Sequence, residues 1–230
     1  MNVCAIVPAG GQGKRMGGTV PKQFQALMGH PILYYTLKTL HDSKLIDSLI
    51  LVVPEKEFEN ARADWLGRPS IVKQVVIGGE KRQDSVFNGY KSAPADTDIV
   101  LVHDGVRPFL SKEMIKETIN IANKFGAAVT AIPIHDTIKQ VDDTGKVQRT
   151  LKREGIWRIQ TPQAFRYNLL GEAFQNAQSN SFYGTDEGAL IEYLGQEVRV
   201  VDGYEWNLKI TRPEDLIVGE ILAAKLFAED

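Results

Sequence analysis

The stretch that decides the fold is VCAIV, residues 3–7, followed without a break by PAGGQGKRMGG, residues 8–18. The first five residues are all apolar, which indicates a short strand buried on both faces of a sheet. The glycines that follow leave the backbone open to a ligand, and the exposed amides of such a loop attract anions. Lys14, Arg15 and, slightly later, Lys22 add positive charge. We therefore predict a buried strand that ends in an anion-binding loop; the alternative is a plain turn between strand and helix.

Two common phosphate-binding motifs do not match this loop. The P-loop requires Ser or Thr after Gly-Lys, whereas Gly13-Lys14 is followed by Arg15. The dinucleotide fingerprint, counted from Gly11, requires glycine at position 16, which is Met16. An NAD-linked oxidoreductase is therefore disfavoured.

Further along the chain, apolar runs alternate with helical patterns. Helices are predicted after Pro31, after the N-cap residue Ser111, and after residues 211–214, which we interpret as a capping box. The apolar runs are residues 48–53, 71–77, 99–102 and 127–132. This alternation predicts an α/β fold with a mostly parallel sheet and helices on both faces, where ligands bind at the carboxyl ends of the strands.

Residues 136–151 break the alternation. They are typical of a β-hairpin that turns at Asp143-Thr144-Gly145. The hairpin has too little apolar surface to be stable alone. From spacing alone, a solvated excursion and an arm that packs on a second subunit remain equally good interpretations.

The composition excludes several classes of protein. The 230 residues carry 27 Lys and Arg against 29 Asp and Glu, so the net charge is −2, which gives no sign of a nucleic-acid or membrane-surface partner. The apolar run at the N-terminus stops at Pro8, too early for a signal peptide or a membrane span. The single cysteine, Cys4, cannot form an internal disulfide. We expect a cytoplasmic protein.

Two more loops carry candidate functional residues. Asp104 follows the strand at 99–102, where its carboxylate would reach the ligand cleft to hold a cation or a sugar hydroxyl, and Arg107 would bind that carboxylate or a phosphate. We expect His103 to be a packed strand residue. Residues 78–85 follow the third strand and resemble a solvated loop with a helix N-cap.

The set of candidate residues contains several cationic side chains but few that could act as a general base. The four histidines have no spacing suited to zinc, and no Gly-x-Ser-x-Gly elbow is present. Transfer of a phosphorus group fits this set, since it requires positioning and charge neutralisation more than proton transfer. An attacking phosphate is already ionised and needs no base.

Seven sequence blocks together resemble the 2-C-methyl-D-erythritol 4-phosphate cytidylyltransferases of the non-mevalonate isoprenoid pathway. The blocks are residues 8–16, 21–24, 78–86, 103–109, 161–165, 184–187 and 207–216. The resemblance covers nearly the whole chain. It implies a single Rossmann-like nucleotidyltransferase domain, residues 1–230, and a homodimer formed through a protruding β-hairpin arm at about 136–155. Gly10 departs from the alanine that many members carry.

The resemblance also implies a reaction and its residues. CMP passes from CTP to methylerythritol phosphate, with Mg²⁺ or another divalent cation held mainly by the CTP phosphates and with Asp104 as a candidate protein ligand. Catalysis is assigned to Arg15 and Lys22. Nucleotide binding is assigned to Ala9, Gly10, Gly11, Gly13, Gly79, Glu80, Ser85 and Asp104. Acceptor binding is assigned to Arg107, Thr185 and Lys209, joined by Thr137 and Arg153 from the partner's arm.

Two alternatives to this reaction remain. Ribitol 5-phosphate cytidylyltransferases share the glycine-rich loop, and Val106 favours them, whereas residues 152–157 look more like the methylerythritol enzymes. A non-catalytic nucleotide-binding protein belongs to a different class, and the presence of Arg15 and Lys22 argues against it.

Overall fold

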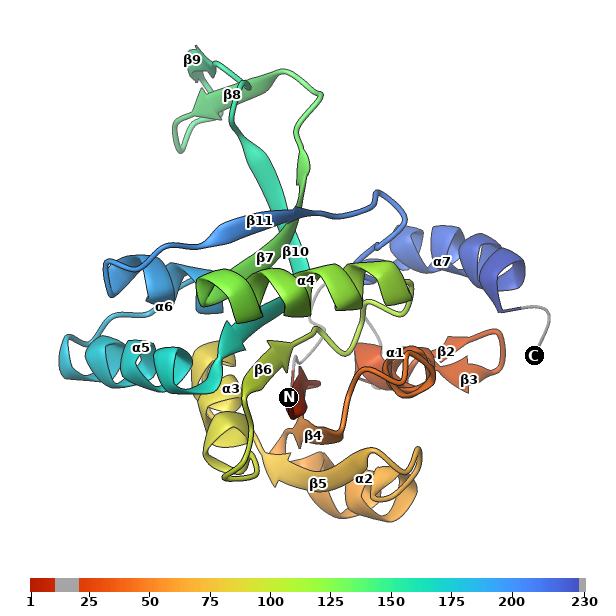
Figure 1. The fold of residues 1–230 in the computed structure, drawn as a ribbon. Coiled ribbons are helices and arrows are strands. Elements are labelled where there is room, and N and C mark those ends of the chain that lie inside the picture. Colours follow the sequence, from red (N-terminus) through yellow and green to blue (C-terminus); the bar gives the residue numbers. More distant parts are fainter. Residues whose placement is uncertain (11–20, 228–230) are drawn as a thin grey trace.

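The computed structural model describes residues 1–10 and 21–227, and its centre is a seven-stranded sheet (Figure 1). In spatial order the strands are β11 (Arg199–Asp202), β7 (Ala127–Pro133), β10 (Trp157–Arg166), β6 (Ile99–Val102), β1 (Val3–Pro8), β4 (Ser48–Val53) and β5 (Val72–Ile77). Every neighbouring pair is parallel except those made by β10, which runs antiparallel to both β6 and β7. The predicted mostly parallel sheet and its five predicted strands are confirmed; β10 and β11 were not predicted.

Helices cover both faces of this sheet. One apolar cluster contains residues of α1 (Ile32–Asp42), α2 (Phe58–Trp65) and α4 (Lys112–Phe125). The opposite cluster contains residues of α3 (Arg82–Lys91), α5 (Tyr167–Ser179) and α6 (Glu187–Tyr193). Ala5 and Ile6 of β1 lie in different clusters, because successive side chains of a strand point to opposite faces. This is why β1 is apolar at every position.

A third apolar cluster lies beside the sheet. It joins α7 (Pro213–Leu226) to α1 and to the small ladder of β2 (Ala26–Leu27) and β3 (His30–Pro31). The helix α7 begins where predicted, but residue 214 is not the capping acid. Instead, one oxygen of Asp215 accepts the backbone N–H groups of Thr211 (2.8 Å) and Arg212 (2.9 Å). The predicted capping box was therefore wrong by one position.

The predicted hairpin is present and stands clear of the sheet, on the extended ends of β7 and β10 (Figure 1). It consists of β8 (Ile138–Val141) and β9 (Val147–Leu151). Asp142 closes the turn by accepting the N–H groups of Thr144 and Lys146, and Gly145 has φ +83°. Val141 and Val147 pair across the hairpin and are each about half exposed.

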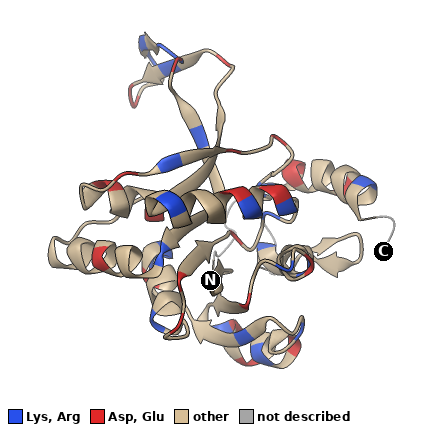
Figure 2. Ribbon diagram, viewed as in Figure 1, with Lys and Arg blue, Asp and Glu red and all other residues tan. Residues whose placement is uncertain are grey.

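Charges of both signs are interspersed over the helices, as expected from the near-neutral net charge (Figure 2). In the part of the chain that the structure describes, no helix is long and apolar enough to cross a bilayer. Two short 3₁₀ helices, η1 (Lys22–Phe24) and η2 (Glu55–Glu57), lie near the carboxyl ends of β1 and β4. They take part in the site described next.

Candidate active site

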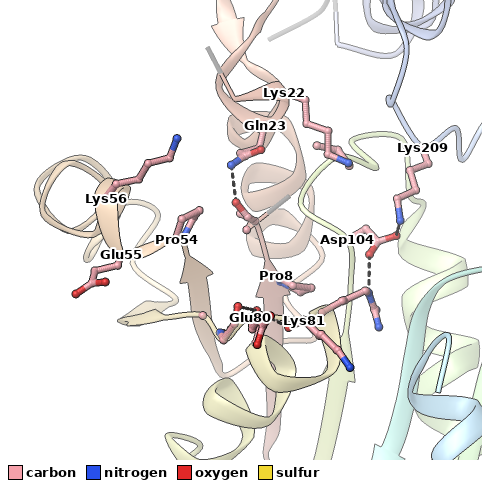
Figure 3. A pocket seen from close by; sticks show the side chains of 17 residues that line it. Pro8, Lys22, Gln23, Pro54, Glu55, Lys56, Glu80, Lys81, Asp104 and Lys209 are labelled. Atoms are coloured by element: carbon pink, nitrogen blue, oxygen red, sulfur yellow. Dashed lines mark hydrogen bonds and ion pairs between the residues drawn. The ribbon is translucent and has the colours of Figure 1, made fainter. Parts of the chain in front are cut away.

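A cavity of about 830 Å³ opens at the carboxyl ends of β1, β4, β5 and β6 (Figure 3). Its walls come from the loops after these strands, together with η1 and the segment before α7. Predicted site residues in the walls are Ala9, Gly10, Lys22, Gly79, Glu80, Ser85, Asp104 and Lys209. The predicted residues Gly11, Gly13 and Arg15 lie outside the described residues. The cavity thus gathers loops from both halves of the chain.

The first wall is the start of the glycine-rich loop. The N–H of Ala9 donates to the carbonyl of Val52 (2.7 Å), which continues the β1–β4 pairing past the end of the strand. Buried Gln23 donates from Nε2 to the carbonyl of Ala9 (2.5 Å; Figure 3). This bond ties η1, and with it Lys22, to the end of β1. Among residues 1–10 and 21–227, a side-chain atom added at Gly10 would meet nothing closer than Oγ of Ser85 at 3.9 Å, so on this side the backbone is open toward the cavity.

The second wall is the loop between β5 and α3. The N–H of Gly79 donates to Oγ of Ser85 (3.1 Å), and the Ser85 hydroxyl faces the carbonyl of Lys81 (3.1 Å). The carboxylate of Asp84 accepts the N–H of Lys81 (3.1 Å), which caps α3. A Cβ at Gly79 would lie 2.3 Å from Cβ of Asp84. The predicted helix start within residues 78–85 is confirmed, since α3 begins at Arg82, and the close approach explains the glycine.

The third wall is centred on the buried carboxylate of Asp104. Its Oδ2 lies 2.8 Å from Nζ of Lys209 (Figure 3) and 3.4 Å from Nε of Arg107. Its Oδ1 lies 3.5 Å from Nε of Arg82. Burial alone would raise the pKa of Asp104, but the three cations, Lys209 foremost, outweigh burial and hold the pKa well below its usual range. Asp104 is therefore ionised at neutral pH.

A buried hydrogen-bond chain fixes the backbone behind Asp104. The N–H of Asp104 donates to Oγ1 of Thr161 (3.0 Å), which lies 3.1 Å from Nδ1 of His103. The other ring nitrogen, Nε2, lies 3.0 Å from the carbonyl of Arg107 and must donate to it. Burial lowers the pKa of His103 to about 4, so the ring is neutral. This geometry agrees with a packed rather than a catalytic His103.

Arg82 and Glu187 form an ion pair that the sequence did not reveal. Nη1 of Arg82 lies 2.8 and 2.9 Å from the two carboxylate oxygens of Glu187, whose side chain is 1% exposed. The opposing effects of burial and of Glu187 leave the pKa of Arg82 raised above its usual value. Both residues stand in the sequence blocks quoted above, but no local sequence pattern predicts that two residues so far apart in the chain form a pair.

Comparisons with known proteins identify the family. The family model described as 2-C-methyl-D-erythritol 4-phosphate cytidylyltransferase matches residues 3–225. The chain belongs to this family. A relative of that name from Clostridium botulinum is 45% identical over 221 residues, covering 96% of this chain and 98% of its own length. A second, from Syntrophus aciditrophicus, is 43% identical over 226 residues, covering 97% and 96% respectively.

Solved structures of the same family share the fold. The 4-diphosphocytidyl-2C-methyl-D-erythritol synthase of Anaerococcus prevotii has a TM-score of 0.83 and 34% identity, covering 96% of this chain and 97% of its own. The 2-C-methyl-D-erythritol 4-phosphate cytidylyltransferase of Francisella tularensis also has a TM-score of 0.83, with 31% identity and coverage of 96% and 99%. Membership of this cytidylyltransferase family confirms the resemblance, the nucleotidyltransferase class and the fold, and it favours the methylerythritol over the ribitol interpretation.

A smaller cavity of about 310 Å³ adjoins the larger one. Lys209 lines both cavities, and Arg107, Arg158 and Arg212 line the smaller one. Arg107 also donates from Nη1 to the carbonyl of Asn207 (2.7 Å), so its guanidinium is held between this carbonyl and Asp104. The smaller cavity therefore carries four cations against two carboxylates, Glu205 and Asp215, and this excess of positive charge suits an anionic ligand.

The structure does not bring three of the predicted acceptor residues to these cavities. Thr137 lies just before β8, and Arg153 donates to the carbonyl of His135 at the base of the arm. Neither Thr137 nor Arg153 lines either of the two cavities. Thr185 is exposed beside the α6 N-cap Asp186, and it also lies outside these walls. The roles of all three stay predictions.

A divalent cation in the larger cavity would find the carboxylate of Asp104 in the wall, together with those of Glu55 and Glu80. Among the described residues, no cluster of three or more His, Cys, Asp or Glu side chains is arranged to hold a metal. Mg²⁺ usually keeps several waters and takes one or two carboxylates plus substrate phosphates. Asp104 in the cavity wall fits such a phosphate-held ion, whereas a site made only of protein ligands does not fit the described residues.

Proposed function

We propose that the chain transfers CMP from CTP to 2-C-methyl-D-erythritol 4-phosphate, giving 4-diphosphocytidyl-2-C-methyl-D-erythritol and pyrophosphate. The observation that carries the proposal is the ion pair of Asp104 and Lys209 at the junction of the two cavities. The larger cavity offers Lys22, open backbone and the Glu80 loop to a nucleotide. The smaller one offers cations to an acceptor phosphate. Family membership names the two substrates.

The residues act by positioning and by neutralising charge. Lys22 would lie along the CTP triphosphate and stabilise the charge that develops as the α-phosphorus is attacked, a role shared with Arg15. Gly79, Glu80 and Ser85 would face the cytosine edge, where its amino group needs an acceptor. Lys209 and Arg107 would hold the acceptor phosphate in line. The acceptor phosphate is already an anion, so no general base is required.

A magnesium ion belongs to this proposal. The CTP phosphates would hold it, with Asp104 as the protein carboxylate. When bound, the ion would neutralise part of the triphosphate charge. We further propose that residues 1–230 act as one nucleotidyltransferase domain and that the reaction takes place in the cytoplasm, as the single, buried Cys4 supports.

We also propose a homodimer in which each arm completes the partner's site. Thr137 and Arg153 lie on the arm, away from the cavities of their own subunit. The exposed Val141 and Val147 give the arm an apolar surface that a second subunit could cover. In this arrangement Thr137 and Arg153 would join Lys209 at the acceptor.

A pyrophosphate-release assay tests the reaction. With CTP and Mg²⁺, we expect release when methylerythritol phosphate is added and at most slow release with ribitol 5-phosphate. Preference for ribitol 5-phosphate would overturn the choice of acceptor. Unchanged release by Lys22→Ala would contradict the role of Lys22, since loss of one such donor typically slows a reaction about 10²–10³-fold.

A further inference from the structure

We propose that Glu187 is a positioning residue for this transfer: it holds Arg82 in place, and Arg82 in turn fixes the carboxylate of Asp104 opposite Lys209. The inference rests on the proposed function, because it assigns a role within that reaction.

Four side chains form a row of alternating charge. Glu187, at the start of α6, receives Nη1 of Arg82 at 2.8 and 2.9 Å. Nε of the same guanidinium lies 3.5 Å from Oδ1 of Asp104. The other oxygen of Asp104 lies 2.8 Å from Nζ of Lys209. The row thus runs from the buried side of α6 to the junction of the two cavities.

Glu187 acts at one remove from the substrates. Arg82, Asp104 and Lys209 line the larger cavity, whereas Glu187 is buried behind them and lies outside the described walls. Arg82 is the link because its planar guanidinium presents separate N–H groups to two carboxylates at once. A lysine could not hold both carboxylates in this fixed geometry.

The local fold has other bonds that hold α6 in place. Gln83 donates from Nε2 to the carbonyl of Phe182 (3.2 Å) and accepts the N–H of Gly184 at its Oε1 (2.9 Å). Asp186 caps α6 by accepting the N–H of Ala189 (2.9 Å), and its other oxygen accepts from Gln163 (2.8 Å). These neutral and capping bonds join α6 to α3 and β10 without Glu187.

The buried pair of Arg82 and Glu187 is therefore not needed to stabilise the fold around α6. Burying a carboxylate and a guanidinium carries a desolvation cost that their attraction often only balances. The distinct effect of Glu187 is on Arg82, whose guanidinium it holds within reach of Asp104. Without Glu187, Arg82 would lose these two hydrogen bonds, and its guanidinium would no longer fix the carboxylate of Asp104 opposite Lys209. The expected damage falls more on alignment of the acceptor than on binding of CTP, because Lys22, the open backbone and the Glu80 loop still hold the nucleotide.

The experiment compares full-length wild-type protein with Glu187→Gln and Glu187→Ala in the pyrophosphate-release assay. We expect kcat to fall about 10-fold to 100-fold in Glu187→Ala, with a smaller loss in Glu187→Gln, which keeps an oxygen acceptor for Arg82. Affinity for CTP without acceptor, measured by calorimetry, should stay within about 3-fold of wild type. Unchanged kcat, or an equal loss of CTP affinity, would overturn the proposal.

Leu190→Val serves as the matched control. Leu190 is fully buried on the same helix and packs in the apolar cluster on that face of the sheet. We expect its melting temperature to fall while kcat stays within about 2-fold of wild type. If Leu190→Val lost as much kcat as Glu187→Gln at a similar melting temperature, the role of Glu187 would be structural and the proposal wrong.

A double substitution isolates the path through Asp104. If Glu187 acts through Asp104, adding Glu187→Gln to Asp104→Asn should lower kcat by less than about 2-fold, because linked residues are not additive. Additive losses would refute this path. Absence of transfer in the wild type with methylerythritol phosphate would refute the proposed function, whereas normal wild-type transfer with unaffected Glu187 variants would refute only this inference.

Discussion

Nζ of Lys209 lies 2.8 Å from Oδ2 of Asp104, and this pair stands where the nucleotide-sized cavity meets the smaller cationic one. Asp104 follows β6, and Lys209 lies just before α7. The pair therefore joins the central sheet to the C-terminal part of the fold. In the proposed reaction, the acceptor phosphate would share Lys209 with Asp104.

Replacing Lys209 should therefore affect the acceptor more than the nucleotide. We expect Lys209→Met, which keeps most of the apolar stem, to lower kcat/KM for methylerythritol phosphate about 10²–10³-fold. The KM for CTP should change much less. Lys225→Met, on exposed α7, is the control and should behave as wild type. Equal losses for both substrates in steady-state kinetics would contradict the assignment.

The buried His103 should make stability depend on pH. Its pKa in the folded protein is about 4, below the value of about 6.5 for an unfolded histidine, so the unfolded state binds the proton more tightly. The stabilisation is fully present above about pH 6.5 and is lost as the pH falls toward 4, by about 3 kcal/mol in total.

Denaturant unfolding of wild type and His103→Gln between pH 4 and 8 checks this dependence. Because glutamine does not titrate, the difference between the two free energies of unfolding should shrink as the pH falls. A constant difference across this range would mean that His103 is not held neutral in the fold.

Two glycines of the site should respond differently to a methyl group. A Cβ at Gly79 would lie 2.3 Å from Cβ of Asp84 and 3.2 Å from its backbone carbon, so Gly79→Ala must displace the loop that faces the nucleotide. We expect the KM for CTP to rise at least about 10-fold, the effect of losing roughly 1.4 kcal/mol of binding. At Gly10 the nearest atom of the described residues is 3.9 Å away, and the Gly10→Ala variant should bind CTP as wild type does. The reverse order of effects in a titration with CTP would count against this placement of the loop.

Buried parallel strands were the predictable part of the fold. The run at 49–53 is buried at every position, and so it is apolar throughout. In contrast, β10 reads WRIQTPQAFR: its first three residues are exposed, and its pairing shifts register between Ile159 and Gln163. Its polar residues Gln160, Thr161 and Gln163 are buried because they hydrogen-bond to distant parts of the chain. A local pattern gives no reason to place this strand between β6 and β7.

The candidate site shows the same contrast between features that a local pattern predicts and features that depend on distant contacts. The loops at Gly10, Gly79 and Asp104 were predicted together because the carboxyl ends of neighbouring parallel strands meet at one edge. The Arg82–Glu187 pair was missed because neither residue has a spacing that indicates its partner. Such pairs are set by how α3 and α6 pack on the same face of the sheet, which no short segment encodes.

The arm gives the last prediction, because it separates the proposed acceptor residues between two subunits. Arg153→Ala damages the arm and Lys209→Ala damages the body, and each homodimer should be nearly inactive. In a mixed dimer, the intact arm of the Lys209→Ala subunit meets the intact body of the Arg153→Ala subunit and completes one site. Random mixing makes half of the dimers mixed, so we expect about a quarter of the wild-type activity to return.

Mixing the two purified variants under conditions that allow subunit exchange, and then measuring pyrophosphate release, checks this directly. A mixture of Lys209→Ala with Arg107→Ala is the control, since both defects lie in the body and no site is restored by exchange. If the first mixture stayed as inactive as its components although mass spectrometry showed mixed dimers, Arg153 would serve its own subunit and the crossed-arm arrangement would be wrong. Monomers in analytical ultracentrifugation of the wild type would contradict it at an earlier step.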